Sequence, residues 1–468
     1  MQESSLAKAT GAIVFYALLA VIALAAVPYG TAQPWWKAVF ECVVFLLASL
    51  SILARLGKSD SPLYQFPFSS AVLWPALGLI AFAFVQTLPA PRFLLAATDQ
   101  RITLSADVFQ TRQFILQIFA LLAVAWLLIT HTNTRRRMRQ LVEVIIGIGV
   151  VSALFGLWRQ ASQHANGFGL RGLRAGYGYA QFINANHFAF LMELALGLAL
   201  GIVVCRGVRG RRLAIYVIAA IPMWLALVLA NSRGGILSLL CQVVLLALLF
   251  SAGRDSHEVE ASSGKVSARL LRASRTVAAR GVLVVALLVG AITTVILVGG
   301  DPLAGRVDSL SVELDRNVAD TFTLRPTIWR ATWHLIKDHP VAGVGFGGYW
   351  IAVTKYHAAS GATTPQEAHN DYLELLASGG VIGLAIGLWF AIALARTAQK
   401  KLARLQTEET RDPNNSFTRA VTIGALVGIL TVAVHSLVDF GLHITINAVV
   451  FTSLVAIVCV RTGGRERT

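Results

Sequence analysis

Apolar runs long enough to cross a membrane recur along almost the whole chain, and no other feature limits its fold as strongly. A transmembrane helix needs about 20 consecutive apolar residues to cross roughly 30 Å of hydrocarbon. Lipid also requires backbone polar groups to be satisfied within the structure, which favours helices. We therefore predict an all-α integral membrane protein with about twelve transmembrane helices. The predicted spans lie near residues 10–29, 36–55, 70–89, 113–131, 140–158, 187–205, 213–231, 234–253, 281–300, 375–395, 419–439 and 443–460.

The composition agrees with this class and excludes others. Hydrophobic residues make up 56% of the 468 positions, charged residues only 14%, and the mean hydropathy is +0.66. Soluble domains are less apolar than this. The net charge of +16 comes from short basic clusters between the apolar runs, so we do not expect nucleic acid as a partner. The four cysteines lack metal-ligand spacing, so neither a disulfide framework nor a zinc site is expected.

The basic residues also predict the orientation of the chain. Most of the 40 Lys and Arg residues fall on the side that carries both termini, with clusters at 135–139 and 206–212. By the positive-inside rule, the termini are predicted to be cytoplasmic. The opposite side then gathers the polar segments 90–112, 159–186, 231–234 and 301–373. The connection at 231–234 is so short that eleven spans remain an alternative to twelve.

The loop 301–373 is the largest polar interruption, and its sequence predicts a short helix near 327–337. Apolar residues recur there at helical spacing, opposite Arg330 and Lys337. Such a pattern favours a helix that lies flat at the membrane interface. The apolar positions are Ile328, Trp329, Trp333 and Ile336.

Glycines follow this predicted helix at 343, 345, 347 and 348, after Pro340. The string resembles a nucleotide-binding loop only superficially, because no predicted strand precedes it. We interpret it as a flexible turn.

The spans and loops divide the chain into consecutive regions. Transmembrane helices occupy 1–170 and 171–300, the large loop occupies 301–373, and C-terminal transmembrane helices occupy 374–468. Within these regions, the polar segments 254–280 and 400–417 are predicted to be linkers.

His369 lies at the end of the large loop, directly before Asn370, Asp371 and Tyr372. A histidine at a helix start often serves only as a cap or an interface residue. Because an imidazole accepts a proton near neutral pH, His369 is also the natural candidate for a general base that activates a hydroxyl. In that role Asp371 or Glu374 would orient the ring, and Asn370 would hold a substrate oxygen.

Three arginines are candidates for binding phosphate. Arg233 stands in the turn between two apolar spans, where an unpaired cation is costly and therefore suggests a binding site. A guanidinium matches phosphate oxygens with paired hydrogen bonds. Arg325 and Arg174 are further candidates on polar segments of the same predicted side.

Other polar residues stand at the ends of spans. Asn184 and Asn186 open the span at 187–205 and either cap that helix or line a binding site. Asp439 is expected to pair either with an arginine or with His435, and both alternatives stay open. No cluster of His, Asp and Glu has convincing metal spacing, so we expect a metal-free reaction.

A transporter is the alternative from another functional class. Transporters bury ionisable residues near the middle of the membrane, where substrate and coupling ions bind. Glu193 is the only clear candidate of that kind in the sequence. The pattern therefore favours a site on one external face.

Together these motifs resemble the O-antigen ligase and O-antigen polymerase family of bacterial polysaccharide membrane enzymes. The resemblance covers residues 182–440, whereas residues 1–170 are similar only in their apolar spans. It departs at Ala180, where a glycine is expected. The motifs are FINANHFA at 182–189, NSRG at 231–234, RPTIW at 325–329, PVAGVGFG at 340–347, AHNDYLE at 368–374 and HSLVDF at 435–440.

The resemblance implies a C-type glycosyltransferase architecture, with short interfacial helices in a large periplasmic loop over the active site. It implies a bacterial inner-membrane enzyme without a cofactor. The donor would be a glycan on undecaprenyl diphosphate, and in ligases the acceptor is a sugar of lipid A–core. In polymerases the acceptor is another lipid-linked repeat, and one related branch transfers glycans to protein.

The resemblance also implies roles for individual residues. His369 would activate the acceptor hydroxyl. Arg233 and Arg325 would bind the diphosphate, with Arg174 as a third candidate. The residues that would contact or orient the sugar are Asn186, Asn370, Asp371, Tyr372 and Asp439.

Overall fold

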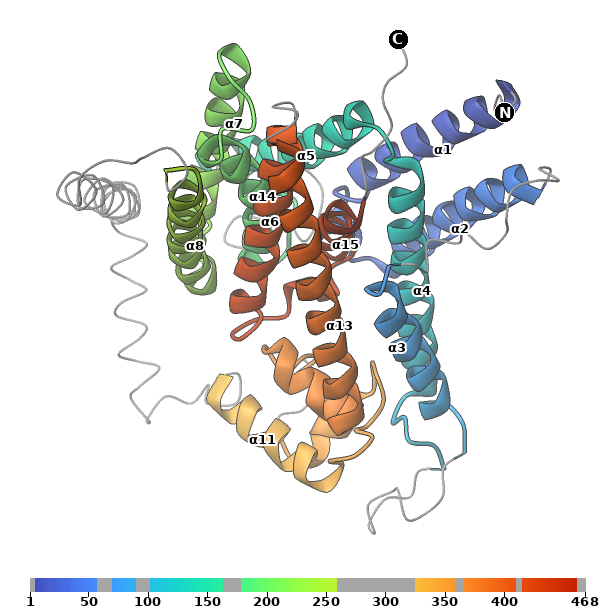
Figure 1. Ribbon diagram of the computed structural model, residues 1–468. Helices are drawn as coiled ribbons and strands as arrows, with labels where there is room; N and C mark the ends of the chain where they lie inside the picture. Colours follow the sequence, from blue (N-terminus) through green and yellow to red (C-terminus); the bar gives the residue numbers. More distant parts are fainter. Residues whose placement is uncertain are drawn as a thin grey trace. The chain divides into compact units, whose positions relative to one another are not determined.

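The computed structural model describes residues 5–56, 70–89, 102–162, 178–258, 325–357, 365–409 and 415–460. In these ranges every regular element is a helix (Figure 1), as the apolar runs predict. The helices are α1 (Ser5–Leu24), α2 (Pro34–Leu56), α3 (Leu73–Gln86), α4 (Val108–His131), α5 (Arg135–Ser162), α6 (Ala185–Val204), α7 (Arg211–Leu229), α8 (Arg233–Glu258), α11 (Arg325–Asp338), α12 (Tyr349–Ala352), α13 (Asp371–Glu409), α14 (Asn415–His435) and α15 (Thr445–Cys459), with the 3₁₀ turns η1 (Tyr29–Thr31), η7 (Val353–Lys355) and η9 (Gly441–His443).

Many of these helices are built to cross a membrane. Among the described residues, seven helices are long and apolar enough to do so, namely α2, α4, α5, α6, α7, α13 and α14. Shorter apolar helical stretches lie at Ala9–Leu24 in α1, Leu73–Gln86 in α3, Arg233–Leu246 in α8 and Thr445–Cys459 in α15. The chain is therefore a multi-pass membrane protein. Each predicted span has its helix except the one at 281–300, which lies outside the described residues.

The helices group into two compact units, and each unit combines segments that are distant in the sequence. Unit 1 comprises Met1–Val144, Ser309–Arg404 and Ser436–Thr468. Unit 2 comprises Ile145–Asp308 and Leu405–His435. Both units therefore draw on both halves of the chain.

In unit 2, α6 packs against α14 through facing glycines. A Cβ atom at Gly201 would lie only 2.3 Å from the Cα of Gly424, and one at Gly197 would lie 2.7 Å from the Cα of Gly428. On each helix the two glycines are four residues apart, so they form one strip along its surface. Small residues at this spacing let membrane helices approach closely and gain van der Waals contact.

In unit 1, the end of the polar loop forms a small packed core of its own. The Thr332 Oγ1 and Tyr349 Oη atoms are 2.7 Å apart inside it and form a buried hydrogen bond. This core joins α11, the glycine turn and the first turns of α13. Its buried residues are Ala331, Leu335, Ile336, Val344, Tyr349, Val353, Ala368 and Ala377.

The glycine turn is bound to a kink in α13. The backbone N–H groups of Val344 and Gly345 donate to the carbonyls of Ala377 and Ser378, each at 3.0 Å. These carbonyls are available because the helix breaks at Gly380, whose φ is +60°. The predicted turn is confirmed, and hydrogen bonds tie its backbone to α13.

The helix predicted near 327–337 is α11, and the apolar positions of the prediction divide between its buried and its exposed side. Ile328 and Ile336 are buried, whereas the side chain of Trp333 is 49% exposed. The Nζ of Lys337, one turn later, lies 5.9 Å from the centre of the Trp333 ring. The ring therefore packs beneath a cation on the outer face. The position of α11 at a membrane interface stays a prediction.

The glycine strip in unit 2 leads to a stability prediction. Gly201→Ala places a methyl group against the α14 backbone and should destabilise the protein by about 1–3 kcal/mol, the usual cost of overpacking. Gly147 on α5 has no atom within 4 Å of an added Cβ. Gly147→Ala should therefore be neutral or stabilise by up to about 1 kcal/mol, because alanine favours a helix. Thermal denaturation of the purified protein in detergent distinguishes them, and equal melting temperatures would contradict the proposed packing.

Candidate active site

His369 lies where two segments of unit 1 meet. One segment leads into α13 at residues 365–374, and the other follows α14 at residues 436–443. Their backbones are joined directly, because the N–H of Asp371 donates to the carbonyl of Ser436 at 2.9 Å. The Ser436 hydroxyl also donates to the Asp371 carboxylate at 2.6 Å.

His369 has a strained backbone that its neighbours hold in place. Its φ is +50°, in the left-handed region that costs a non-glycine residue about 1–2 kcal/mol. The preceding residue, Ala368, is held by hydrogen bonds to both its carbonyl and its N–H. The Trp329 indole donates to the carbonyl of Ala368 at 3.0 Å, and the Ala368 N–H donates to the Glu374 carboxylate at 2.9 Å. Strain of this kind concentrates at functional sites.

The His369 ring faces a buried carboxylate that also binds an arginine. The Nδ1 of His369 lies 3.5 Å from the Oδ1 of Asp439, and the side chain of Asp439 is fully buried. The other oxygen, Oδ2, accepts a hydrogen bond from Arg325 at 3.1 Å. The His369 side chain is 32% exposed, and its Nδ1 is buried and makes no hydrogen bond, so its contact with Asp439 is one of charge.

This geometry decides between the two partners considered for Asp439. Asp439 pairs with Arg325, whereas His435 lies 2.7 Å from Glu193 inside unit 2. Of the two alternatives that the sequence left open, the structure has the arginine partner.

Asp371 and Glu374, the residues predicted to orient His369, are engaged elsewhere. Asp371 accepts the hydroxyl hydrogen bond of Ser436, and Glu374 accepts the backbone N–H just before His369. The carboxylate that lies nearest to the ring is Asp439. Sequence spacing did not reveal this, because Asp439 is 70 positions further along the chain.

Asn370 joins the two segments and caps α13. Its Oδ1 accepts from the backbone N–H groups of Tyr372 and Leu373, both at 3.0 Å. Its Nδ2 donates to the carbonyl of Leu437 at 2.8 Å. Both ends of this amide thus bind backbone groups. The neighbouring Tyr372 side chain is exposed.

A second histidine, His443 of η9, lies among three carboxylates beside the His369 loop. Its Nδ1 is 3.3 Å from Glu367, and its Nε2 is 3.6 Å from Asp371 and 3.8 Å from Glu374. Burial lowers the pKa of the His443 imidazole, but the Glu367 and Glu374 carboxylates outweigh it and raise that pKa well above its usual range. Burial raises the pKa of Glu367, but His443 outweighs it and holds that pKa well below its usual range.

The same cluster contains a donor set that a divalent cation could use. One ligand atom each from Glu367, Glu374 and His443 lies within 4.8 Å of the others. Sequence spacing missed this group because His443 comes from a distant segment. However, both imidazole nitrogens face carboxylate oxygens, as suits a protonated ring donating from each. We therefore assign the cluster to ion pairing and not to metal binding.

In unit 2, the predicted polar residues stand at helix starts. Asn184 caps α6, since its Oδ1 accepts from the N–H of Asn186 at 2.9 Å. Ser232 caps α8 in the same way, with its hydroxyl 3.0 Å from the N–H of Gly235. Arg233 is the first residue of α8. The predicted cap is thus confirmed for Asn184, and two separate helices flank the NSRG turn.

The loop before α6 shows why a glycine is expected at residue 180. Ala180 has a φ of +48°, a conformation that glycine adopts without strain. Its carbonyl accepts a hydrogen bond from Arg159 at 2.7 Å. Arg159, on α5, is buried and was not predicted as a structural residue. Arg174 lies outside the described residues.

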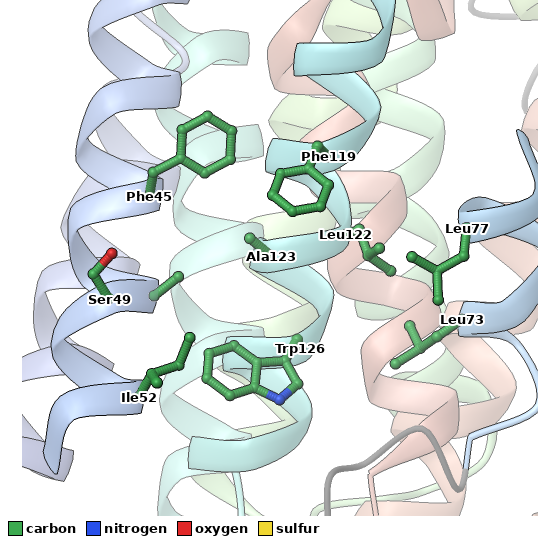
Figure 2. A pocket seen from close by; sticks show the side chains of 10 residues that line it. Phe45, Ser49, Ile52, Leu73, Leu77, Phe119, Leu122, Ala123 and Trp126 are labelled. Atoms are coloured by element: carbon green, nitrogen blue, oxygen red, sulfur yellow. The ribbon is translucent and has the colours of Figure 1, made fainter. Parts of the chain in front are cut away.

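A cavity of about 330 Å³ lies between α2, α3 and α4 of unit 1. Figure 2 shows that Phe45 and Ile52 of α2 face Phe119 and Trp126 of α4 across it. None of the described residues that line this cavity is ionisable. Its lining is apolar apart from the Ser49 hydroxyl and the Trp126 indole.

Comparison with known proteins agrees with this reading of the sequence. A family model described as O-antigen ligase matches residues 218–388. The match includes Arg233, Arg325 and His369, whereas Asn186 and Asp439 lie outside it. No curated protein matches the chain. Residues 218–388 are therefore similar to the O-antigen ligase family, which agrees with the resemblance that the motifs carry.

Proposed function

We propose that this protein is an O-antigen ligase that transfers a glycan from undecaprenyl diphosphate to a sugar hydroxyl of lipid A–core. The observation that carries the proposal is the group formed by Arg325 and His369, which lie in the matched region, and Asp439, which follows α14. It combines a proton acceptor, a carboxylate that orients it, and a cation suited to phosphate. This is the set of groups that glycan transfer from a lipid diphosphate requires.

In the proposed reaction, His369 is the general base. Its Nε2 removes the proton from the acceptor hydroxyl as the oxygen attacks the anomeric carbon of the donor. The bond between that carbon and the diphosphate oxygen breaks, and undecaprenyl diphosphate leaves with the electron pair. A single displacement of this kind inverts the anomeric configuration. The buried Asp439 stabilises the imidazolium that forms, as a carboxylate does for a histidine base.

The arginines stabilise the charge that develops on the leaving diphosphate. Arg325 uses one terminal nitrogen for Asp439, and its side chain is 36% exposed. A guanidinium has five N–H donors, so most remain for phosphate oxygens. Arg233 at the start of α8 is assigned to the same group, because helix N-termini attract phosphate. Arg174 is the third candidate, and Asn186 and Tyr372 are assigned to the sugar.

The site is assigned to the periplasmic face of the bacterial inner membrane, with both termini cytoplasmic. The distribution of Lys and Arg between the two sides supports this orientation. A lipid-linked donor needs no soluble nucleotide sugar, which suits a compartment without nucleotide supply. The reaction is proposed to require no metal or other cofactor.

Other acceptors and one other class remain candidates. A polymerase or a protein O-oligosaccharyltransferase would use the same donor with a different acceptor. A transporter of lipid-linked oligosaccharide would need ionisable groups available to its cargo at mid-membrane. Glu193, the residue that raised this alternative, lies 2.7 Å from His435 with both side chains fully buried. This contact suits a structural pair and favours the enzyme.

The base assignment predicts that His369→Ala abolishes transfer, because the acceptor hydroxyl then has no proton acceptor. A transfer assay on membranes, with the amount of protein measured by immunoblot, tests this. His334→Ala is the matched control, since His334 is exposed on α11 of the same unit. Normal transfer by His369→Ala would exclude the proposed base.

The orienting role of Asp439 predicts the effect of removing its charge. Asp439→Asn should lower kcat about 100-fold, because an oriented general base contributes about 10²–10⁴ in rate. Glu143→Gln, which removes an exposed carboxylate on α5, should leave kcat unchanged. If the two variants had the same kcat in the purified enzyme, Asp439 would have no part in the reaction.

The choice of acceptor predicts what a deletion strain accumulates. For a ligase, gel electrophoresis of surface polysaccharide should show bare lipid A–core, while polymerised glycan persists on its lipid carrier. Single repeats attached to core, without long chains, would instead identify a polymerase. Unchanged lipopolysaccharide together with loss of glycosylated protein would identify the protein-modifying branch.

A further inference from the structure

We propose that His443 is a positioning residue for the reaction, which holds the His369 loop in its working conformation through ion pairs with Glu367, Asp371 and Glu374. This inference rests on the proposed function, because it concerns the geometry of the proposed base. His443 lies outside the matched region 218–388 and in no motif that the sequence singles out.

The first step of the argument is where the three carboxylates stand. Glu367 lies two residues before His369, Asp371 lies two residues after it, and Glu374 lies one helical turn further on. All three face one imidazole, at 3.3, 3.6 and 3.8 Å. A single cation thus contacts the chain on both sides of the proposed base.

The second step is the electrostatic balance of the cluster. Three carboxylates close together repel one another, so this arrangement is stabilised by positive charge between them or by a proton on one of them. His443 is the cation that lies within ion-pair distance of all three among the described residues. Its own side chain is 39% exposed, whereas that of Glu374 is 10% exposed, so the ring closes the cluster from outside.

The third step connects this cluster to the base. Glu374 accepts the hydrogen bond of the Ala368 N–H at 2.9 Å, next to the strained residue His369. Without the His443 cation the three carboxylates would repel one another, so the Glu374 carboxylate would be displaced and the Ala368 N–H would lose its hydrogen-bond partner. The left-handed conformation of His369 would then relax, and its ring would leave Asp439.

The fourth step is how the surrounding contacts hold His443 in place. Phe440 lies between the two histidines, with its ring centre 4.8 Å from that of His369 and 5.8 Å from that of His443. The carbonyl of Gly441 accepts a hydrogen bond from Asn447 of α15 at 2.9 Å. A helix thus fixes the turn that carries His443. A site supported in this way keeps its geometry within the fraction of an ångström that catalysis needs.

Kinetics of the purified full-length protein in detergent test the inference, with undecaprenyl-diphosphate-linked glycan as donor and purified lipid A–core as acceptor. His443→Gln removes the cation and should lower kcat about tenfold or more, since small displacements of a reacting group are costly. The KM for the donor should stay within about twofold, because His443 does not touch substrate. His443→Lys restores the cation and should recover most of the lost kcat. His334→Gln is the matched control and should behave like wild type.

Several outcomes would overturn the inference. A kcat of His443→Gln equal to that of His334→Gln would show that the loop needs no such support. Equal kcat values for His443→Lys and His443→Gln would show that the charge is irrelevant. A rise confined to KM would make His443 a substrate-binding residue. Loss of wild-type activity in chelator, restored by a divalent cation, would make the cluster a metal site.

Two further measurements keep the test decisive. If His443→Gln does not accumulate in membranes, Glu367→Gln removes the nearest carboxylate and should lower kcat by a similar factor without changing KM. His369→Ala is assayed in parallel. Normal transfer by that variant would defeat the proposed function, whereas an inactive His369→Ala beside a fully active His443→Gln would defeat only this inference.

Discussion

The charge of the buried Asp439 carboxylate is the interaction on which the candidate site depends. A buried charge left without a partner costs about 3–5 kcal/mol, so its compensation constrains the surrounding chain. Arg325 begins α11 and His369 ends the loop before α13, and both face Asp439. Satisfying this one carboxylate therefore brings the two ends of the loop segment to the turn after α14. The proposed base and the proposed phosphate ligand are held together as a result.

Backbone hydrogen bonds then give the loop a defined shape. The kink of α13 at Gly380 frees helix carbonyls, and the glycine turn binds to them. The start of the same helix is capped by Asn370, directly after the strained His369. Strain at a single residue persists only where neighbouring contacts determine the conformation. The two histidines face different carboxylates, because His369 lies beside Asp439 while His443 lies among Glu367, Asp371 and Glu374.

Unit 2 is stabilised differently from the polar loop of unit 1, because its helices are mostly apolar. Hydrophobic burial gives little drive for helix association in lipid, so close packing must supply it. The glycine strips of α6 and α14 permit that packing, and the Glu193–His435 pair compensates two buried ionisable groups in the same helix pair. In the loop before α6, Ala180 adopts a left-handed conformation although it carries a side chain.

The sequence by itself determined the helices and the membrane class, because the spacing of apolar residues and the length of a span are local properties, and its short motifs carry the resemblance to a family. It also placed His369, Arg233 and Arg325 as candidates, since their residue types limit their chemistry. Only the tertiary structure decided that Asp439 pairs with Arg325, that Asp371 and Glu374 are engaged elsewhere, and that His443 joins the loop. These contacts link residues up to 114 positions apart. Which distant partner a buried charge finds depends on how the chain packs, and no local pattern records it.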